Sequence, residues 1–424
     1  MRALRFDISI PRYLAARSVG KWADWAVFGA PSGLGLVDLP EPVLPGPQWV
    51  RLEIISCGVC GTDLSTLRFK TSLSLEPFAS FPAVLGHEIL ARVIETGSEV
   101  RAVRVGDRVA VDPSISCEMR GRLREDWCSC CAAGLPSTCA KAGEATPGIA
   151  RGFVLGSNRD LLGGFSERIV AHQSQLFPVR PEIDDLSVAL IEPLSVSVHA
   201  ALKAQVDPGA SVLVIGSGPI AFATIWALRA LGHAGPLVAQ TKRVNESAMA
   251  RELGASATAA PGPEARKALF ATGASAYKPL VGPEVFGGGG YGVVFDCVGS
   301  RASLDQALRY VAPRGRVVLL GCAGQVGPLD LAFVWSREVQ VQGYLCYGTE
   351  TWRGERLHTY EVTQRLLAQG KAPVSKLVTH VFPLKRYREA LAAAAHRRDS
   401  GAVKVLVVPQ ERGSLYQSVL ASGS

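Results

Sequence analysis

Residues that bind metals recur in the first half of the chain, next to turn-forming residues. Cys60 follows a β-like run, His87 and Glu88 belong to a Gly-His-Glu turn, and Glu192 precedes a proline. Zinc accepts sulfur, imidazole and carboxylate ligands, and a catalytic zinc site uses three of them and leaves one position for water or substrate. Each residue alone is more typical of a structural role, as a lone buried cysteine is. Together they predict a catalytic site with Cys60 and His87 as zinc ligands, and Glu88 and Glu192 compete for the third position.

Five further cysteines lie between residues 117 and 139. The segment MRALRFDISIPRYL carries charges and Pro11 where a secretion signal needs an apolar core, so we expect a cytoplasmic protein. Thiols stay reduced in that compartment. Closely spaced cysteines therefore indicate a metal site rather than disulfides.

A glycine turn joins a predicted strand to a predicted helix within SVLVIGSGPIAFATIWALRALG, residues 211–232. Gly216 suits the tight turn, Gly218 lets the backbone approach a pyrophosphate, and Ala221 permits close packing of helix on strand. Amide groups at the start of the helix then face the anion. Such a turn also occurs in domains that bind no cofactor, but the local context favours a dinucleotide. The predicted cofactor-binding residues of the turn are Gly216, Gly218, Pro219 and Ile220.

The composition is that of a globular, loop-rich enzyme. The 424 residues are enough for two or more domains, and 48% of them are hydrophobic. The formal charge of +8 is spread along the chain without a Lys/Arg block, which argues against a nucleic-acid partner. The apolar run 212–228 contains glycines and Pro219 and has no second copy, so it predicts a buried segment rather than a membrane span. We expect a small-molecule partner, no nucleic acid and no membrane.

The candidate residues need elements to position them. Short β-like runs with Pro/Gly turns occupy the region from about residue 22 to residue 111 and predict an all-β region with metal-binding residues at its turns. Further buried parallel strands are expected at 236–240, 293–295 and 317–320, and residues 260–292 predict a loop with short helical pieces. From about Tyr344 the chain is expected to return to the first domain.

The chain resembles the zinc-containing medium-chain dehydrogenases/reductases, the alcohol and polyol dehydrogenase family. The matching motifs, in the family's order over roughly residues 20–410, are CGVCGTD at 57–63, GHE at 86–88, GDRV at 106–109, GGFSERIV at 163–170, EPLSVSVHA at 192–200 and GSGPIA at 216–221. Glutamate at position 192 is most similar to the polyol, sugar and threonine dehydrogenase branch.

The resemblance implies an α/β protein with two domains. A mostly-β GroES-like catalytic domain would comprise residues 1–195 and 345–424, with a structural-zinc lobe at 113–143. A Rossmann domain with a doubly wound parallel sheet would comprise residues 196–344. The family also implies a homodimer or homotetramer.

The family spacing also bears on the cysteine lobe. Its members space four zinc cysteines with two residues between each of the first three and seven before the last. Cys128, Cys131 and Cys139 keep the spacing of the last three ligands, but Glu125 stands at the position of the first. Cys117 is predicted to replace it from the far side of the insertion CEMRGRLREDW, which leaves Cys130 spare. The alternatives are Cys130 in place of Cys117, or an empty lobe. The predicted structural-zinc ligands are Cys117, Cys128, Cys131 and Cys139.

Residues after the second predicted strand bear on the choice of cofactor. Enzymes of this fold that use NAD place an acidic residue about 20 positions past the glycines, whereas a basic residue accommodates the 2′-phosphate of NADP. This chain has Gln240 followed by Thr241, Lys242 and Arg243, which favours NADP over NAD unless the two cations only form a solvated loop. By resemblance, the backbone near Val298 and Ala323 would face the nicotinamide.

The predicted activity is reversible oxidation of an alcohol, polyol or sugar-like substrate, with zinc acting on the alcohol oxygen and a nicotinamide accepting hydride. Thr62 matches the family residue that accepts the alcohol proton, although it also suits a helix N-cap. Ser65 stands where many members have a relay histidine. The alternatives are a zinc-free NADPH reductase of the same superfamily and a catalytically silent cofactor-binding protein. The predicted catalytic residues are Cys60, Thr62, His87 and Glu192.

Overall fold

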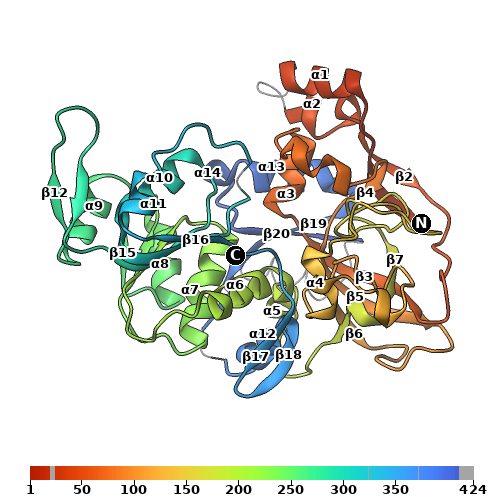
Figure 1. The fold of residues 1–424 in the computed structure, drawn as a ribbon. Helices are drawn as coiled ribbons and strands as arrows, with labels where there is room; N and C mark the ends of the chain where they lie inside the picture. Colours follow the sequence, from red (N-terminus) through yellow and green to blue (C-terminus); the bar gives the residue numbers. More distant parts are fainter. Residues whose placement is uncertain (20–23, 323, 371, 410–424) are drawn as a thin grey trace. The chain divides into compact units, whose positions relative to one another are not determined.

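The computed structural model describes residues 1–19, 24–322, 324–370 and 372–409. The chain forms two compact units, shown in sequence colours in Figure 1. Unit 1 comprises Met1–Glu192, Tyr347–Gln364 and Ser375–Ser424, and unit 2 comprises Pro193–Cys346 and Arg365–Val374. The α/β class is confirmed, whereas the predicted boundaries 1–195, 196–344 and 345–424 stay predictions.

Unit 1 is built on a mostly antiparallel sheet of seven strands in the order β19-β20-β3-β5-β6-β8, with β7 also paired to β3. β19 and β20 alone run parallel. Apolar side chains of these strands, with those of α13, form one continuous core. The strands are β3 (Trp49–Gly58), β5 (Glu88–Thr96), β6 (Arg108–Val111), β7 (Arg168–His172), β8 (Leu176–Pro178), β19 (Val378–Pro383) and β20 (Lys404–Val408).

Two small sheets and several short helices complete unit 1. One sheet has the order β2-β1-β4, and β17 pairs with β18. These strands are β1 (Arg2–Phe6), β2 (Leu34–Asp38), β4 (Ala83–Val84), β17 (Thr349–Trp352) and β18 (Glu355–His358). The helices are α1 (Ile10–Val19), α2 (Asp24–Val27), α3 (Gly61–Leu67), α4 (Ser129–Ala132), α5 (Asp185–Val188), α13 (Tyr387–Ala395) and α14 (Arg397–Ser400). Helices α6 (Ile191–Ala204) and α12 (Thr359–Leu367) continue from unit 1 into unit 2.

Unit 2 contains six parallel strands in the order β11-β10-β9-β14-β15-β16. Figure 1 shows α7 and α8 on one side of this sheet and α10 and α11 on the other, as expected for a doubly wound sheet. The strands are β9 (Val212–Ile215), β10 (Leu237–Gln240), β11 (Ala257–Ala259), β14 (Tyr291–Asp296), β15 (Val311–Leu319) and β16 (Gln340–Gly343). The helices are α7 (Pro219–Ala230), α8 (Val244–Glu252), α9 (Pro263–Phe270), α10 (Arg301–Tyr310) and α11 (Ala332–Ser336).

The prediction of a loop with short helical pieces at 260–292 is wrong in part. Helix α9 is one such piece, but β12 (Ser275–Tyr277) and β13 (Val285–Gly287) form an antiparallel pair. Tyr277 lies opposite Val285 and Ala276 opposite Phe286, so β-forming side chains pair across a Pro/Gly turn.

The register of the parallel sheet determines where a ligand can bind. Ile215, the last residue of β9, lies between Gln240 of β10 and Asp296 of β14. The turns that follow these three strands therefore meet at one edge of the sheet, which is where ligands bind in open parallel sheets. In the described part of the chain, no helix is long and apolar enough to cross a membrane.

Candidate metal centres and cofactor site

The predicted catalytic ligands meet at one end of the β3–β5 pair. Gly58, at the end of β3, lies opposite Glu88, at the start of β5. Cys60 follows the first strand by two residues and His87 immediately precedes the second, so antiparallel pairing brings them together. The ligand atoms of Cys60, His87 and Glu88 all lie within 4.8 Å of one another. Sulfur, imidazole and carboxylate form a donor set that fits zinc.

Asp63 orients two of these residues. Its Oδ2 accepts a hydrogen bond of 2.9 Å from the backbone N–H of Cys60, and its Oδ1 lies 3.6 Å from His87 Nδ1. A carboxylate on one ring nitrogen leaves the other nitrogen as the metal donor. That second nitrogen, Nε2, lies 3.4 Å from the hydroxyl of Thr62. Asp63 belongs to the CGVCGTD motif, and a carboxylate in the first turn after Cys60 is the sequence signal for this contact.

Glu88 has a buried cationic partner that the sequence analysis missed. Both of its carboxylate oxygens lie 2.5 Å from Lys404 Nζ, and both side chains are 2% exposed. β20 carries Lys404 and pairs with the end of β3, where Val407 lies opposite Cys57. A lone lysine in the apolar run VKVLVV was the only sequence signal, since a lysine is almost never fully buried unless it is paired.

Glu192 lies at the start of α6 and is not part of the group formed by Cys60, His87 and Glu88. It is buried, and its Oε1 accepts a hydrogen bond of 3.2 Å from the hydroxyl of Tyr347. Burial raises the pKa of Glu192 to about 8, and the nearby charge of Glu88 adds to this effect.

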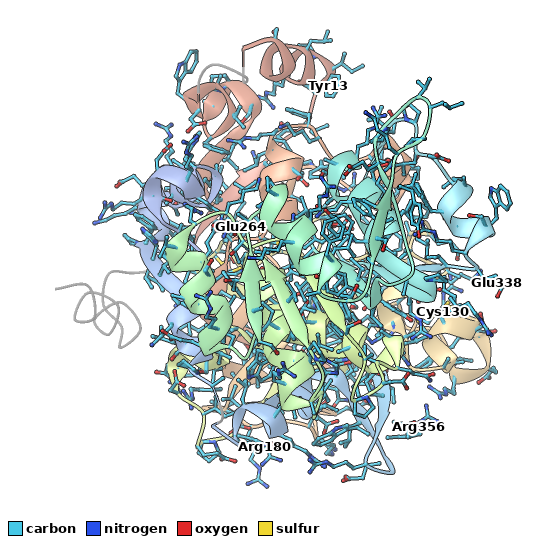
Figure 2. The ribbon with its side chains drawn as sticks, turned by 90° about the vertical axis from the view of Figure 1, so that its left-hand side faces the viewer. Tyr13, Cys130, Arg180, Glu264, Glu338 and Arg356 are labelled. Carbon is cyan, nitrogen blue, oxygen red and sulfur yellow. The ribbon has the colours of Figure 1, made fainter. Side chains whose placement is uncertain are left out.

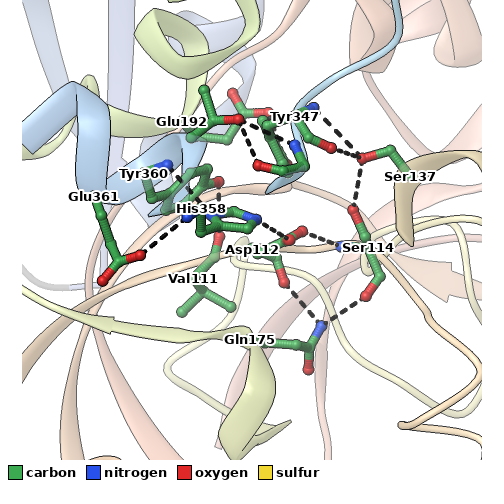
Figure 3. Close-up of polar contacts among 12 residues, drawn as sticks. Val111, Asp112, Ser114, Ser137, Gln175, Glu192, Tyr347, His358, Tyr360 and Glu361 are labelled. Carbon is green, nitrogen blue, oxygen red and sulfur yellow. Dashed lines mark hydrogen bonds and ion pairs between the residues drawn. The ribbon is translucent and has the colours of Figure 1, made fainter. Parts of the chain in front are cut away.

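Tyr347 connects Glu192 to the cysteine lobe, as Figure 3 shows. Its carbonyl oxygen accepts a 2.8 Å hydrogen bond from Ser137, and the hydroxyls of Ser137 and Ser114 lie 3.1 Å apart. The backbone N–H of Ser114 donates to Asp112 at 2.7 Å. A continuous polar chain therefore runs from the lobe to the buried glutamate.

The four predicted structural ligands meet inside the lobe. Cys117, Cys128, Cys131 and Cys139 have sulfur atoms within 4.8 Å of one another. Cys130, which Figure 2 labels, lies outside this group. A hydrogen bond from Cys131 lowers the pKa of Cys139 to about 5, while the same bond raises the pKa of Cys131. Four converging sulfurs, of which Cys128 and Cys139 have a lowered pKa because of hydrogen bonds from their neighbours, fit a closed structural zinc site.

Arg120 holds the insertion that carries Cys117. Its side chain is 5% exposed and donates to three backbone carbonyls, those of Glu144 at 2.7 Å, Ala150 at 3.3 Å and Gly152 at 2.9 Å. The insertion is therefore an ordered part of the lobe, which explains how Cys117 reaches the other three cysteines.

The glycine turn of unit 2 has the form that a pyrophosphate requires. Gly216 has φ +125°, and a Cβ there would meet Val298 Cγ2 at 3.1 Å. Gly218 is the N-cap of α7 and Pro219, which has no N–H, follows at its first position, so the backbone N–H groups of Ile220 and Ala221 lie at the helix start. This cradle fits a dinucleotide. Ala323 lies outside the described residues.

The residues after β10 have partners within unit 2. The side chains of Gln240 and Gln306 exchange hydrogen bonds of 3.0 and 2.6 Å. Lys242 is exposed, whereas Arg243 forms an ion pair of 2.5 Å with Glu246, a residue that the sequence analysis did not single out.

Comparisons with known proteins identify the family. Residues 46–181 match the alcohol dehydrogenase GroES-like domain, and residues 219–359 match the zinc-binding dehydrogenase family. The chain is 30% identical to L-idonate 5-dehydrogenase from Vitis vinifera, over 88% of this chain and 92% of the relative. It is 29% identical to sorbitol dehydrogenase from Arabidopsis thaliana, over 88% of this chain and 93% of the relative.

A solved protein from Sinorhizobium meliloti, described as a zinc-binding dehydrogenase bound to NADP, has a TM-score of 0.69 and 26% identity and covers 96% of this chain and 99% of its own. The two converging ligand sets, the dinucleotide turn and these relatives lead to one conclusion. The chain belongs to the zinc-binding medium-chain dehydrogenases/reductases, as a zinc-dependent NAD(P) enzyme of the alcohol and polyol dehydrogenase type that acts on CH–OH donors.

Proposed function

We propose that this enzyme reversibly oxidises a hydroxyl group of a polyol or sugar-like substrate and that it prefers NADP over NAD. The observation that carries the proposal is the convergence of Cys60, His87 and Glu88, with the hydroxyl of Thr62 3.4 Å from the histidine ring. The similarity to L-idonate 5-dehydrogenase and sorbitol dehydrogenase supports this substrate class.

Cys60 and His87 would hold the catalytic zinc, with Glu88 or Glu192 as the third ligand. Lys404 binds both oxygens of Glu88, whereas Glu192 lies outside the converging group, so the two carboxylates stay alternatives for the third position. Zinc bound there supplies Lewis acidity that lowers the pKa of a substrate hydroxyl. The second zinc would be structural and held by the four cysteines of the lobe.

Thr62 would accept the substrate proton at its Oγ1 and pass its own hydroxyl proton on to water. It lies in the first turn of α3, and its hydroxyl lies 3.4 Å from Nε2 of His87. Ser65 follows one turn later on the same helix and replaces the histidine of many family members.

The cofactor would bind to unit 2. Gly216, Gly218 and the first N–H groups of α7 would hold the pyrophosphate. Lys242 and Arg243 favour the 2′-phosphate of NADP, because Gln240 puts no carboxylate at the end of β10. The relative from Sinorhizobium meliloti that was solved with NADP supports this preference. A cytoplasmic location and a homodimer or homotetramer stay predictions.

Zinc content per chain tests the proposal directly. We expect two zinc ions in the desalted wild type and one in the Cys60→Ser, His87→Ala double variant, which should also lose NADP-dependent oxidation of a polyol panel. One zinc in both proteins would contradict the catalytic metal. If both proteins hold one zinc ion and still oxidise NADPH, a zinc-free reductase is favoured. If they hold one zinc ion and bind NADPH tightly without turnover, a silent binding protein is favoured.

A further inference from the structure

Glu246 joins the two loops that would surround the ribose of the cofactor. Its side chain is 5% exposed. Its Oε2 accepts a 3.0 Å hydrogen bond from the backbone N–H of Lys242, and its Oε1 accepts bonds of 2.9 and 2.5 Å from Nε and Nη2 of Arg243. Ser217, within the glycine turn, also donates to it. A buried carboxylate therefore links the turn after β9 to the loop after β10.

Helix capping explains only one of these contacts. Glu246 is the third residue of α8, and its bond to Lys242 satisfies a backbone N–H just before the helix. Glu264 in the first turn of α9 makes the same bond to the residue four positions earlier, Ala260, at 2.9 Å, but it is exposed (Figure 2). The burial of Glu246 and its bonds to Ser217 and Arg243 go beyond a helix cap.

The position of Glu246 creates competition for Arg243. The proposed function assigns this guanidinium to the 2′-phosphate of NADP, yet here it forms a charge-assisted pair with a carboxylate. Burial opposes the charge on Glu246, but the hydrogen bonds from Arg243, Lys242 and Ser217 outweigh it and lower its pKa. The carboxylate therefore stays ionised at neutral pH, and a phosphate must compete with it.

We propose that Glu246 sets the cofactor preference of this enzyme, because its carboxylate competes with the 2′-phosphate of NADP for Arg243. The inference rests on the proposed function, in which Arg243 recognises that phosphate. NAD has no 2′-phosphate and binds without displacing the pair. The wild type therefore discriminates less strongly between the two cofactors than its Lys-Arg sequence indicates.

Equilibrium binding of the cofactors to the full-length, zinc-loaded enzyme without bound nucleotide tests the proposal independently of turnover. Isothermal titration calorimetry would compare NADP with NAD, and 2′,5′-ADP with 5′-AMP as fragments that carry only the adenosine end. In Glu246→Gln we expect NADP and 2′,5′-ADP to bind about tenfold more tightly, because one charge-assisted contact becomes available. NAD and 5′-AMP should change by less than about twofold, since neither has a 2′-phosphate for Arg243. Glu264→Gln, the matched helix-cap control, should change neither pair.

A double-mutant cycle identifies the route of the effect. Arg243→Ala should weaken NADP binding and should abolish the gain of Glu246→Gln when the two are combined. Glu246→Asp shortens the side chain and keeps its charge, so it should give a smaller gain if Glu246→Gln does not fold. Equal shifts for NADP and NAD, no shift, or a gain that persists without Arg243 would overturn the inference. A wild type that binds neither cofactor would instead contradict the proposed function itself.

Discussion

Thr62 is the residue whose removal separates proton transfer from metal binding. Its hydroxyl lies 3.4 Å from His87 but is not part of the ligand group. Thr62→Ala should lower kcat by roughly 10²–10⁴-fold, the usual contribution of a positioned proton acceptor. Thr62→Ser, which keeps the hydroxyl, should retain most turnover. Elemental analysis should find the same zinc content in both variants, and nearly full turnover of Thr62→Ala would exclude the relay role.

Lys404 neutralises the buried carboxylate of Glu88. Lys404→Met should cost about 3–5 kcal/mol of unfolding free energy, because it leaves Glu88 buried without its partner. Urea denaturation would measure this loss. Lys70→Met, which changes an exposed lysine of unit 1, should have little effect. If the combined variant with Glu88→Gln recovers none of the loss, the ion pair is not its cause.

His172 links stability to pH. The side chain is 3% exposed, and burial lowers the pKa of His172 to about 4 from an ordinary 6.5. Between these two pH values the unfolded chain therefore binds more protons than the folded chain. The free energy of unfolding is unaffected by this group above about pH 6.5 and decreases as the pH falls from 6.5 toward 4. The slope should approach about 1.4 kcal/mol per pH unit. Denaturant titrations from pH 7 to pH 4.5 should show a shallower dependence in His172→Gln, and an unchanged slope would contradict this assignment.

At the residue scale, local motifs indicated Cys60 and His87, which each stand at a strand end with turn residues beside them, and the structure brings these two side chains together with Glu88 but not with Glu192; their roles as zinc ligands stay predictions. Lys404 could not be predicted, since it lies 316 positions from Glu88 and no local pattern records their contact. Glu246 was overlooked for a related reason: its sequence neighbourhood is that of an ordinary helix start.

The cysteine lobe is the element that depends on metal most directly. It is small, and its buried apolar cluster consists largely of the cysteines themselves. Cys117→Ser should therefore release one zinc per chain and lower the thermal stability of unit 1. Cys130→Ser is the matched control, because this cysteine is in the same lobe but outside the ligand group. The reverse result, with zinc lost only from Cys130→Ser, would show that the insertion does not supply a ligand.

At the element scale, hydrophobic runs predicted the strands β9, β10, β14 and β15, because strands buried on both faces are continuously apolar. The pair β12–β13 lacks that signal, since β12 is exposed, β13 buries only its central residue, and both strands have three residues and lie among prolines and glycines. Local sequence patterns do not predict the strand order of the sheet in unit 1 either, because β20 and β3 pair although most of the chain separates them in sequence.

At the scale of the whole molecule, the two units have separate cores and should respond separately to their ligands. Hydrogen exchange measured by mass spectrometry should show that EDTA increases exchange in the lobe at 113–143 and around residues 57–88. NADP at 100 times its Kd should stabilise unit 2 by about 2.7 kcal/mol and protect the turn after β9. A uniform change across both units on adding either reagent would show that they do not respond separately.

Unit 1 consists of three separate segments of the chain, so its strands become available at different times during translation. Cys60, His87 and Glu88 emerge from the ribosome early, but β20 is translated only after the whole segment Pro193–Cys346. Until then Glu88 has no counter-ion and β3 lacks the neighbour that carries it. The growing polypeptide therefore passes through a stage in which it holds zinc-binding side chains in an unfinished sheet. A product released before residue 404 lacks both the counter-ion of Glu88 and the strand that carries it.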